Sequence, residues 1–158
     1  MKEPENATPA PGSAGRLLAL DLGAKRVGVA VSDELRITVN PLHAIERRSW
    51  KDLLRRVAAV VETYDARGLV IGLPLSLEGT EGSAAKDVRA IAGKFQLSLA
   101  VPVYLQDERL TTFAATALLK ASGRSAREIE REVDSEAATL ILGDFIANNR
   151  DINLLNQT

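Results

Sequence analysis

The sequence has no cysteine and only one histidine. Without cysteine, disulfide bridges, thiolate zinc sites and thiol nucleophiles are excluded, and nothing in the chain requires an oxidising compartment. A single histidine, His43, argues against a histidine-based metal cluster or a Ser-His-Asp triad. Acidic side chains are therefore the main candidates for metal binding and catalysis.

Long apolar runs and a positive net charge are also lacking, and aromatic residues are few. No stretch is long and apolar enough to span a bilayer. The formal net charge is -1, which argues against a general electrostatic binder of nucleic acid, because such domains are usually basic. Aromatic residues make up 4% of the chain, so no stacking platform distinguishes an RNA substrate from a DNA substrate. We expect any nucleic-acid contact to come from local charge clusters.

The first fifteen residues carry three prolines and two glycines but no apolar core, so they resemble neither a signal peptide nor a membrane anchor. We predict a disordered tail at residues 1–15, one globular domain at 16–148 and a second tail at 149–158. A hydrophobic fraction of 46% is enough for the core of a single domain of this size. We expect a cytoplasmic protein.

Apolar periodicity predicts the order of strands and helices. Three strand-like runs at residues 16–21, 26–32 and 37–45 are joined by short connections, which favour an antiparallel meander. A helix follows Ser49, and then strands and helices alternate: a strand at 68–73, a helix capped by Ser83, a strand at 101–108 and helices after 111 and from about 134. Such alternation calls for parallel strands. The order predicts an α/β fold of the ribonuclease H-like class, a mixed five-stranded sheet flanked by helices.

Three isolated acids stand at the ends of predicted elements. Asp21 closes an apolar strand before a glycine turn, Glu108 closes a later strand, and Asp134 begins the last helix. Carboxylate oxygens suit Mg²⁺ or Mn²⁺, and paired ions of this kind can activate water and stabilise the leaving oxygen in phosphodiester hydrolysis. Each acid alone also has an ordinary explanation, as a turn residue, as a partner of Arg109 or as a helix-start charge.

Four ordered motifs make the sequence more specific than the acids alone. They are DLGAKRVGVA at residues 21–30, GLPL at 72–75 with GTEG at 79–82, DERLTT at 107–112 and DSEAA at 134–138. Together they resemble the YqgF/RuvX family, whose members are associated with pre-16S rRNA processing and are described as Holliday-junction-resolvase-like. The resemblance covers roughly residues 16–148. One departure is Ser76, where many relatives have asparagine, and this difference concerns substrate detail.

The resemblance implies that Asp21, Glu108 and Asp134 are the catalytic acids and the ligands of Mg²⁺ or Mn²⁺. Asp107 precedes Glu108, and strand alternation places the two side chains on opposite faces, so we expect only one to point at the metals. Glu108 is the preferred ligand, and Asp107 is the alternative.

Several side chains near these acids are candidates for holding substrate phosphates. They are Lys25, Arg26, Arg109, Thr111 and Thr112. For Lys25 and Arg26, an ordinary solvated turn explains the charges equally well. A wider basic patch at Arg47, Arg48, Lys51, Arg55 and Arg56 would guide a polyanion towards the site. A second basic stretch at 124–131 alternates with glutamates, as is typical of a charged helix face.

The function expected from these features is a metal-dependent nuclease that processes the 5′ end of pre-16S rRNA. Holliday-junction resolution is the alternative, and a symmetric junction would favour a homodimer. An actin-like ATPase needs two such domains around its nucleotide, and one chain of this length holds only one. A non-catalytic factor that binds nucleic acid or pre-ribosomal particles is a further alternative, because the presence of the three acids permits catalysis without proving it.

Overall fold

The computed structural model describes residues 15–108 and 135–149, so Asp134 and the segment that contains Arg109, Thr111 and Thr112 lie outside the described residues. Residues 1–14 and 150–158, which make up most of the tails predicted at 1–15 and 149–158, lie outside the described residues as well. No helix in the described ranges has the length and apolar character needed to cross a membrane.

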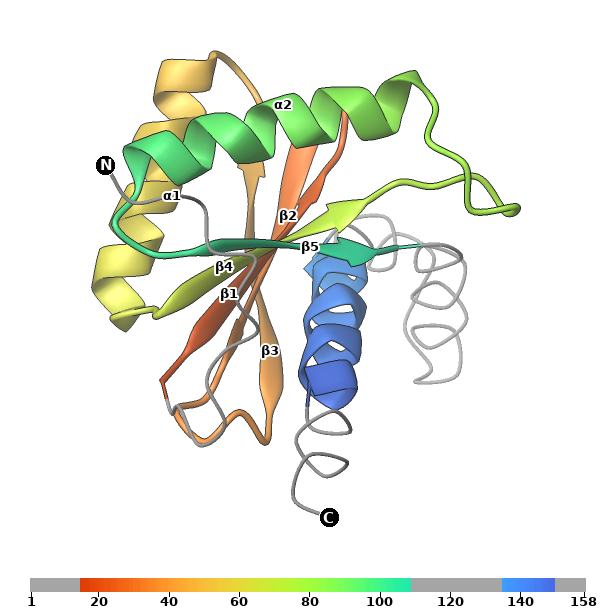
Figure 1. The fold of residues 1–158 in the computed structure, drawn as a ribbon. Helices are drawn as coiled ribbons and strands as arrows, with labels where there is room; N and C mark the ends of the chain where they lie inside the picture. The colour runs from red at the N-terminus through yellow and green to blue at the C-terminus, as the bar shows by residue number, and fades with distance from the viewer. Residues whose placement is uncertain (1–14, 109–134, 150–158) are drawn as a thin grey trace, which may run out of the picture.

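The five strands form one mixed sheet with the order β3-β2-β1-β4-β5 (Figure 1). The antiparallel meander consists of β1 (Leu17–Leu22), β2 (Arg26–Ser32) and β3 (Val39–Glu46). The parallel part adds β4 (Gly68–Leu73) beside β1 and β5 (Val103–Asp107) beside β4. The predicted mixed sheet is confirmed. The third and fifth strands differ from the predicted runs, since β3 extends to Glu46 and β5 begins only after Pro102, which has no N–H for a sheet ladder.

Two helices on one face begin with different N-terminal caps. The predicted helix after Ser49 is α1 (Trp50–Tyr64), and the Ser49 hydroxyl accepts a 3.1 Å hydrogen bond from the Asp52 N–H. The second helix is α2 (Ser83–Ser98), but its cap is Gly82 and not Ser83 as predicted. An isolated β-bridge between Leu75 and Glu81 closes the preceding loop, so the chain enters the helix one residue earlier than the serine suggested.

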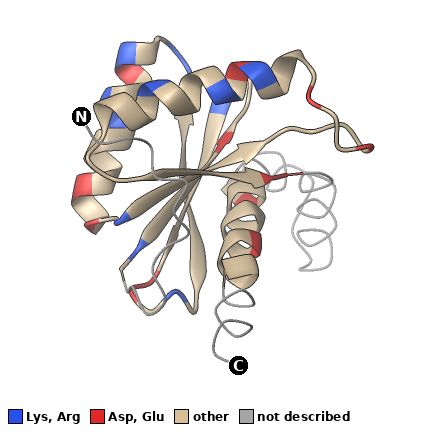
Figure 2. Cartoon of the chain, viewed as in Figure 1, with Lys and Arg blue, Asp and Glu red and all other residues tan. Residues whose placement is uncertain are grey.

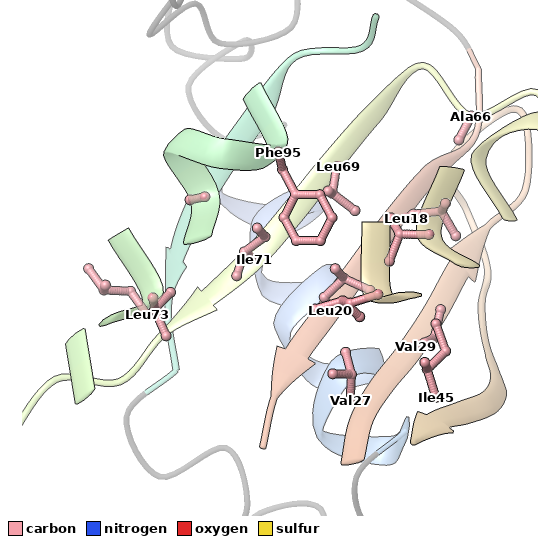
Figure 3. Close-up of a cluster of buried hydrophobic side chains, with 14 of the residues drawn as sticks. Leu18, Leu20, Val27, Val29, Ile45, Ala66, Leu69, Ile71, Leu73 and Phe95 are labelled. Atoms are coloured by element: carbon pink, nitrogen blue, oxygen red, sulfur yellow. The ribbon is translucent and has the colours of Figure 1, made fainter. Parts of the chain in front are cut away.

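The sheet separates two hydrophobic cores. Residues that alternate along the strands pack under α1 and α2 on one face, as Figure 3 shows for Leu18, Leu20, Ile71 and Phe95. Residues of opposite parity, including Leu17 and Ala19, pack against the helix at residues 135–149 on the other face. Period-two alternation of strand side chains therefore assigns each strand residue to one of two helical layers.

Trp50, the first residue of α1, packs against residues of α2. Its ring lies 4.8 Å from the Phe95 ring, centroid to centroid, in an edge-on arrangement, and Lys94 Nζ lies 5.5 Å from the Trp50 ring centroid. The expectation that Trp50 is a packing residue is confirmed by these contacts. His43 lies in β3, inside the strand predicted at residues 37–45, and its side chain is exposed.

Candidate active site

Asp21 lies at the end of β1 on the face covered by the 135–149 helix. It follows Leu17 and Ala19 at intervals of two, and both of those residues belong to the core on that face. The next turn is tight, because the Gly23 N–H donates a 3.0 Å hydrogen bond to the Asp21 carbonyl, and a Cβ on Gly23 would be 2.5 Å from the Arg26 carbonyl oxygen. The glycine therefore allows the chain to turn directly after Asp21.

Glu108 reaches the same face from β5. Its N–H donates a 3.1 Å hydrogen bond to the Leu73 carbonyl, which continues the parallel pairing of β4 and β5 by one residue. Tyr104, four residues earlier, packs in the core under the 135–149 helix, so alternation places Glu108 on that face. Because β1, β4 and β5 are parallel, their carboxyl ends meet at one edge of the sheet, where open α/β sheets bind ligands.

The Asp21 and Glu108 carboxyl groups are close enough to change each other's ionisation. Burial is the largest cause that raises the pKa of Glu108, and together with the Asp21 charge, a side-chain hydrogen bond with Asp21 and the Asp107 charge it brings this pKa to about 8. A carboxyl with this pKa is mostly protonated at neutral pH. The two groups therefore share a proton when no cation is present, as expected of two acids held together in a partly desolvated position.

Gly72 provides the space for this pair. It lies in β4 between the strands that carry the two acids, and a Cβ added to it would overlap the Glu108 carboxylate and lie 2.5 Å from Ile141 Cδ1 of the 135–149 helix. Any larger side chain would compete with Glu108 for the same position. The motif at 72–75 contained this glycine, but its role depends on contacts that only the folded chain shows.

Asp107 belongs to the opposite side of the sheet. It has the same parity along β5 as Val103 and Leu105, which pack in the core under α1 and α2. The Asp107 charge is the last of the four causes that raise the Glu108 pKa, whereas burial and Asp21 dominate. The geometry therefore favours Glu108 over Asp107 as the partner of Asp21.

Of the residues predicted to bind substrate, only Lys25 and Arg26 lie within the described ranges. Lys25 and Arg26 are exposed in the turn after Asp21 and at the first residue of β2. Arg109, Thr111, Thr112 and the third acid, Asp134, are outside the described residues. Ser135, which follows Asp134 in sequence, is buried, and its hydroxyl donates a 2.8 Å hydrogen bond to the Leu42 carbonyl of β3.

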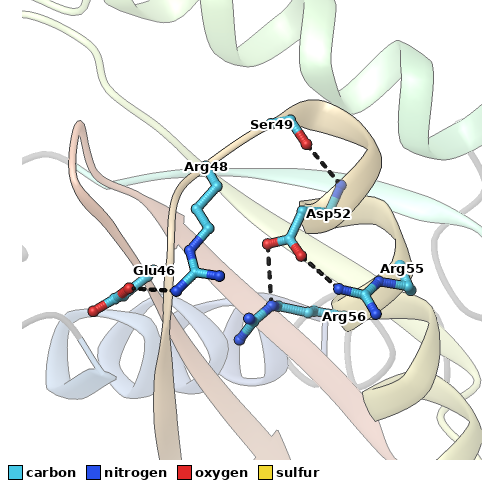
Figure 4. A network of polar contacts seen from close by, with 6 residues as sticks. All are labelled: Glu46, Arg48, Ser49, Asp52, Arg55 and Arg56. Carbon is cyan, nitrogen blue, oxygen red and sulfur yellow. Dashed lines mark hydrogen bonds and ion pairs between the residues drawn. The ribbon is translucent and has the colours of Figure 1, made fainter.

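Three residues of the wider basic patch form ion pairs with nearby acids (Figure 4). Arg55 and Arg56 both form ion pairs with Asp52, at 2.7 and 3.1 Å, and Arg48 pairs with Glu46 at 3.1 Å. Arg47 behaves differently, because its Nη1 donates a 3.0 Å hydrogen bond to the Gly23 carbonyl in the turn after Asp21. The sequence placed Arg47 only in the wider patch, and no local signal linked it to that turn.

The donor chemistry of the pair fits a divalent cation. The described residues contain no group of three or more acidic, histidine or cysteine side chains that could hold a metal ion, so within them a cation at this position could be held by the carboxylates of Asp21 and Glu108. Mg²⁺ commonly binds through one or two carboxylates and keeps several waters. A cation at Asp21 and Glu108 would also remove the charge repulsion that raises the Glu108 pKa.

The chain is similar to known proteins over nearly its whole length. Residues 15–148 match the family described as RuvX, Holliday junction resolvase. The chain belongs to the RuvX family. Relatives in this family include a "Putative pre-16S rRNA nuclease" of Anaeromyxobacter sp. strain K, 43% identical over 83% of this chain and 96% of its own length. Proteins of the same name from Synechococcus elongatus and Koribacter versatilis are 39% and 37% identical, over 85% and 92% of this chain and 90% and 92% of their own lengths.

Solved structures of low sequence identity share the fold. The Thermus thermophilus RuvC complex with a Holliday junction superimposes with a TM-score of 0.53 at 13% identity, covering 85% of this chain and 95% of that one. The yeast mitochondrial Holliday junction resolvase gives a TM-score of 0.50 at 10% identity, covering 90% and 83%. The predicted ribonuclease H-like fold, the RuvX family and the reaction class of a phosphodiester-hydrolysing nuclease are thus confirmed.

Proposed function

We propose that this RuvX-family chain is a divalent-metal-dependent nuclease that trims the 5′ end of pre-16S rRNA, with Asp21, Glu108 and Asp134 as its metal ligands. The observation that carries the proposal is the convergence of Asp21 and Glu108 from two different strands at the carboxyl edge of the sheet. The curated relatives named for pre-16S rRNA support this substrate. Asp134 enters on the family resemblance alone.

The chain's own groups prepare the site for Mg²⁺ or Mn²⁺. Gly72 leaves room for the Glu108 carboxylate, and the proton shared by Asp21 and Glu108 is the group that a cation replaces. When bound, the metal supplies a water of lowered pKa as nucleophile and neutralises charge on the leaving oxygen. Lys25, in the turn after Asp21, and Arg26, the first residue of β2, are proposed to orient the substrate phosphate. Arg109, Thr111 and Thr112 are proposed for the same task.

A Holliday junction is the second candidate substrate. It is favoured by the family description and by the shared fold with resolvases solved on such junctions. This function would require a homodimer, because a symmetric junction presents two equivalent strands for cleavage. The rRNA function instead implies work on pre-ribosomal particles in the cytoplasm.

The test is cleavage by the purified full chain with Mg²⁺ or Mn²⁺ on four substrates: a pre-16S leader, unrelated single-stranded RNA, duplex DNA and a four-way DNA junction. We expect selective cleavage of the leader. Asp21→Asn and Glu108→Gln should each reduce the rate by at least about a hundredfold, since loss of groups that merely support metal ligands already costs about 10–100-fold. Asp65→Asn is a matched control, because Asp65 is an exposed acid at the end of α1.

The substrate pattern separates the candidates. Cleavage of the junction alone would replace the rRNA assignment with DNA resolution. Binding without cleavage of any substrate would reject the nuclease proposal in favour of a binding factor. A large loss in Asp107→Asn together with normal activity in Glu108→Gln would transfer the ligand role to Asp107.

A further inference from the structure

Five basic residues lie in the β1–β2 turn, at the start of β2, directly after β3 and at the start of α1. We call Lys25, Arg26, Arg47, Arg48 and Lys51 the β2–β3 corner. Arg26 is paired with Glu46 in the sheet register, and the Arg47 N–H donates a 2.9 Å hydrogen bond to the Lys25 carbonyl. The corner therefore adjoins the end of β1, the strand that carries Asp21.

The cations of this region differ in how far nearby acids neutralise them. Glu46 pairs with Arg48, and Asp52 pairs with both Arg55 and Arg56 (Figure 4). Within the described part of the chain, no carboxylate forms an ion pair with Lys25, Arg47 or Lys51. Among the basic residues of the corner, these three are therefore the ones that no described acid is paired with, in a chain whose formal net charge is -1.

Arg47 is the member of the corner that is held in place. It is half-buried, its Nη1 donates to the Gly23 carbonyl at 3.0 Å, and Gly23 in turn donates its N–H to the Asp21 carbonyl. A guanidinium carries five N–H donors, and this hydrogen bond uses one of them. An arginine fixed in this way loses little conformational freedom when it binds phosphate through its planar fork of donors.

An isolated pair of carboxylates repels a phosphodiester, so a nuclease site of this kind needs cations beside it. Figure 2 shows basic residues on α1, α2 and the strand ends, with acids among them. Lys25, Arg47 and Lys51 are the basic residues of the corner with which no acid in the described ranges forms an ion pair. We propose that Lys25, Arg47 and Lys51 bind the phosphodiester backbone of the substrate strand next to the Asp21–Glu108 pair, with Arg47 as the preorganised contact.

This inference deepens the proposed function, because it assumes that the strand held at the corner is the one presented to the Asp21–Glu108 pair. Binding itself does not depend on cleavage. It can therefore be measured with the full chain in EDTA, where a metal-dependent reaction cannot occur. Fluorescence anisotropy of a labelled single-stranded RNA and a labelled DNA duplex, over a range of salt concentrations, reports both affinity and the number of phosphate contacts.

Arg47→Gln should weaken RNA binding at least about tenfold, the scale of one hydrogen bond between charged groups. The triple variant Lys25→Gln, Arg47→Gln, Lys51→Gln should reduce the slope of log affinity against log salt by about 2, at about 0.7 per contact for a single strand. Arg48→Gln and Arg55→Gln are matched controls, because these arginines are exposed but paired with Glu46 and Asp52, and each should change affinity less than about twofold.

Two further observations separate binding from folding and from catalysis. Arg47→Lys keeps the charge without the planar fork, so partial recovery of affinity at an unchanged melting temperature would show that Arg47 binds phosphate. An unchanged salt slope in the triple variant, or equal losses in the Arg48 and Arg55 controls, would overturn the inference. If the wild type binds strands with the expected slope but cleaves nothing, the proposed function fails and the inference stands. The RNA and duplex DNA arms show which backbone the corner prefers.

Discussion

Replacing Gly72 with alanine should displace Glu108 from Asp21. The added Cβ would lie 2.5 Å from Ile141 Cδ1 and would overlap the Glu108 carboxylate, whereas ordinary contacts of a Cβ begin near 3.4 Å. One neighbour must therefore move by about 0.9 Å, the difference between these two distances. Ile141 is fully buried in the core under the 135–149 helix, so the partly exposed Glu108 side chain is the group that can rotate away.

The expected cost has two parts. Overpacking of this kind costs about 1–3 kcal/mol of unfolding free energy, which corresponds to a lowering of the melting temperature by about 2–12 °C in a chain of this size. The displaced carboxylate can no longer share a cation with Asp21, so Mn²⁺ affinity should fall by about 10–100-fold. The loss of metal affinity should exceed what a general loss of stability produces, because the variant remains folded at room temperature.

Calorimetric Mn²⁺ titration and thermal unfolding with and without Mn²⁺ would check both parts. Gly93→Ala is the matched control, because Gly93 lies inside α2 and a Cβ there meets nothing within 4 Å. That substitution should raise stability by up to about 1 kcal/mol through helix propensity and leave Mn²⁺ affinity unchanged. Wild-type Mn²⁺ affinity in Gly72→Ala would refute the reasoning that Gly72 makes room for a metal ligand.

Two other predictions concern ionisation and helix capping. Because the pKa of Glu108 is raised to about 8 in the folded chain, metal binding below that pH must release its proton, so Mn²⁺ affinity should rise about tenfold per pH unit up to pH 8 and then level off. In the absence of metal, the stability contributed by protonated Glu108 should be fully present below its unfolded pKa of 4.5 and should be lost as pH rises through 8. In Glu108→Gln, the pH dependence of Mn²⁺ affinity and that of stability should both vanish. Ser49→Ala removes the hydroxyl that accepts the Asp52 N–H and should cost about 1 kcal/mol in chemical denaturation, whereas Ser83→Ala should cost less, because Ser83 makes no cap bond to α2.

Much of the fold follows from local sequence signals. The short turn after Asp21 and the period of the apolar residues were sufficient to predict the antiparallel meander, and the strand-helix alternation predicted the parallel strands. Alternation along β5 also predicted that Asp107 and Glu108 point to opposite faces, and the packing of Leu105 and Tyr104 in different cores agrees with it. These features depend on neighbours within a few residues, so a single sequence contains them.

The parts that could not be predicted depend on residues far apart in the chain. Gly72 and Ile141 meet across the sheet, so the space that Gly72 leaves for Glu108 has no local signature. Arg47 appeared equivalent to Arg48 and Arg55 in sequence, yet it binds the turn at Gly23 while the other two pair with acids. The start of α2 also differs from the prediction by one residue, because the bridge between Leu75 and Glu81 determines where the preceding loop ends.

The central claim is that Asp21 and Glu108 bind the same divalent cation. The most direct measurement is anomalous diffraction from crystals of the full chain grown with Mn²⁺ near pH 8, with Asp21→Asn crystals as the control. We expect an anomalous peak about 2.0–2.2 Å from a carboxylate oxygen of each acid, within the range of metal-oxygen distances for ions of this kind, and its loss in Asp21→Asn. A peak that contacts neither acid, or one that persists unchanged in Asp21→Asn, would contradict the account.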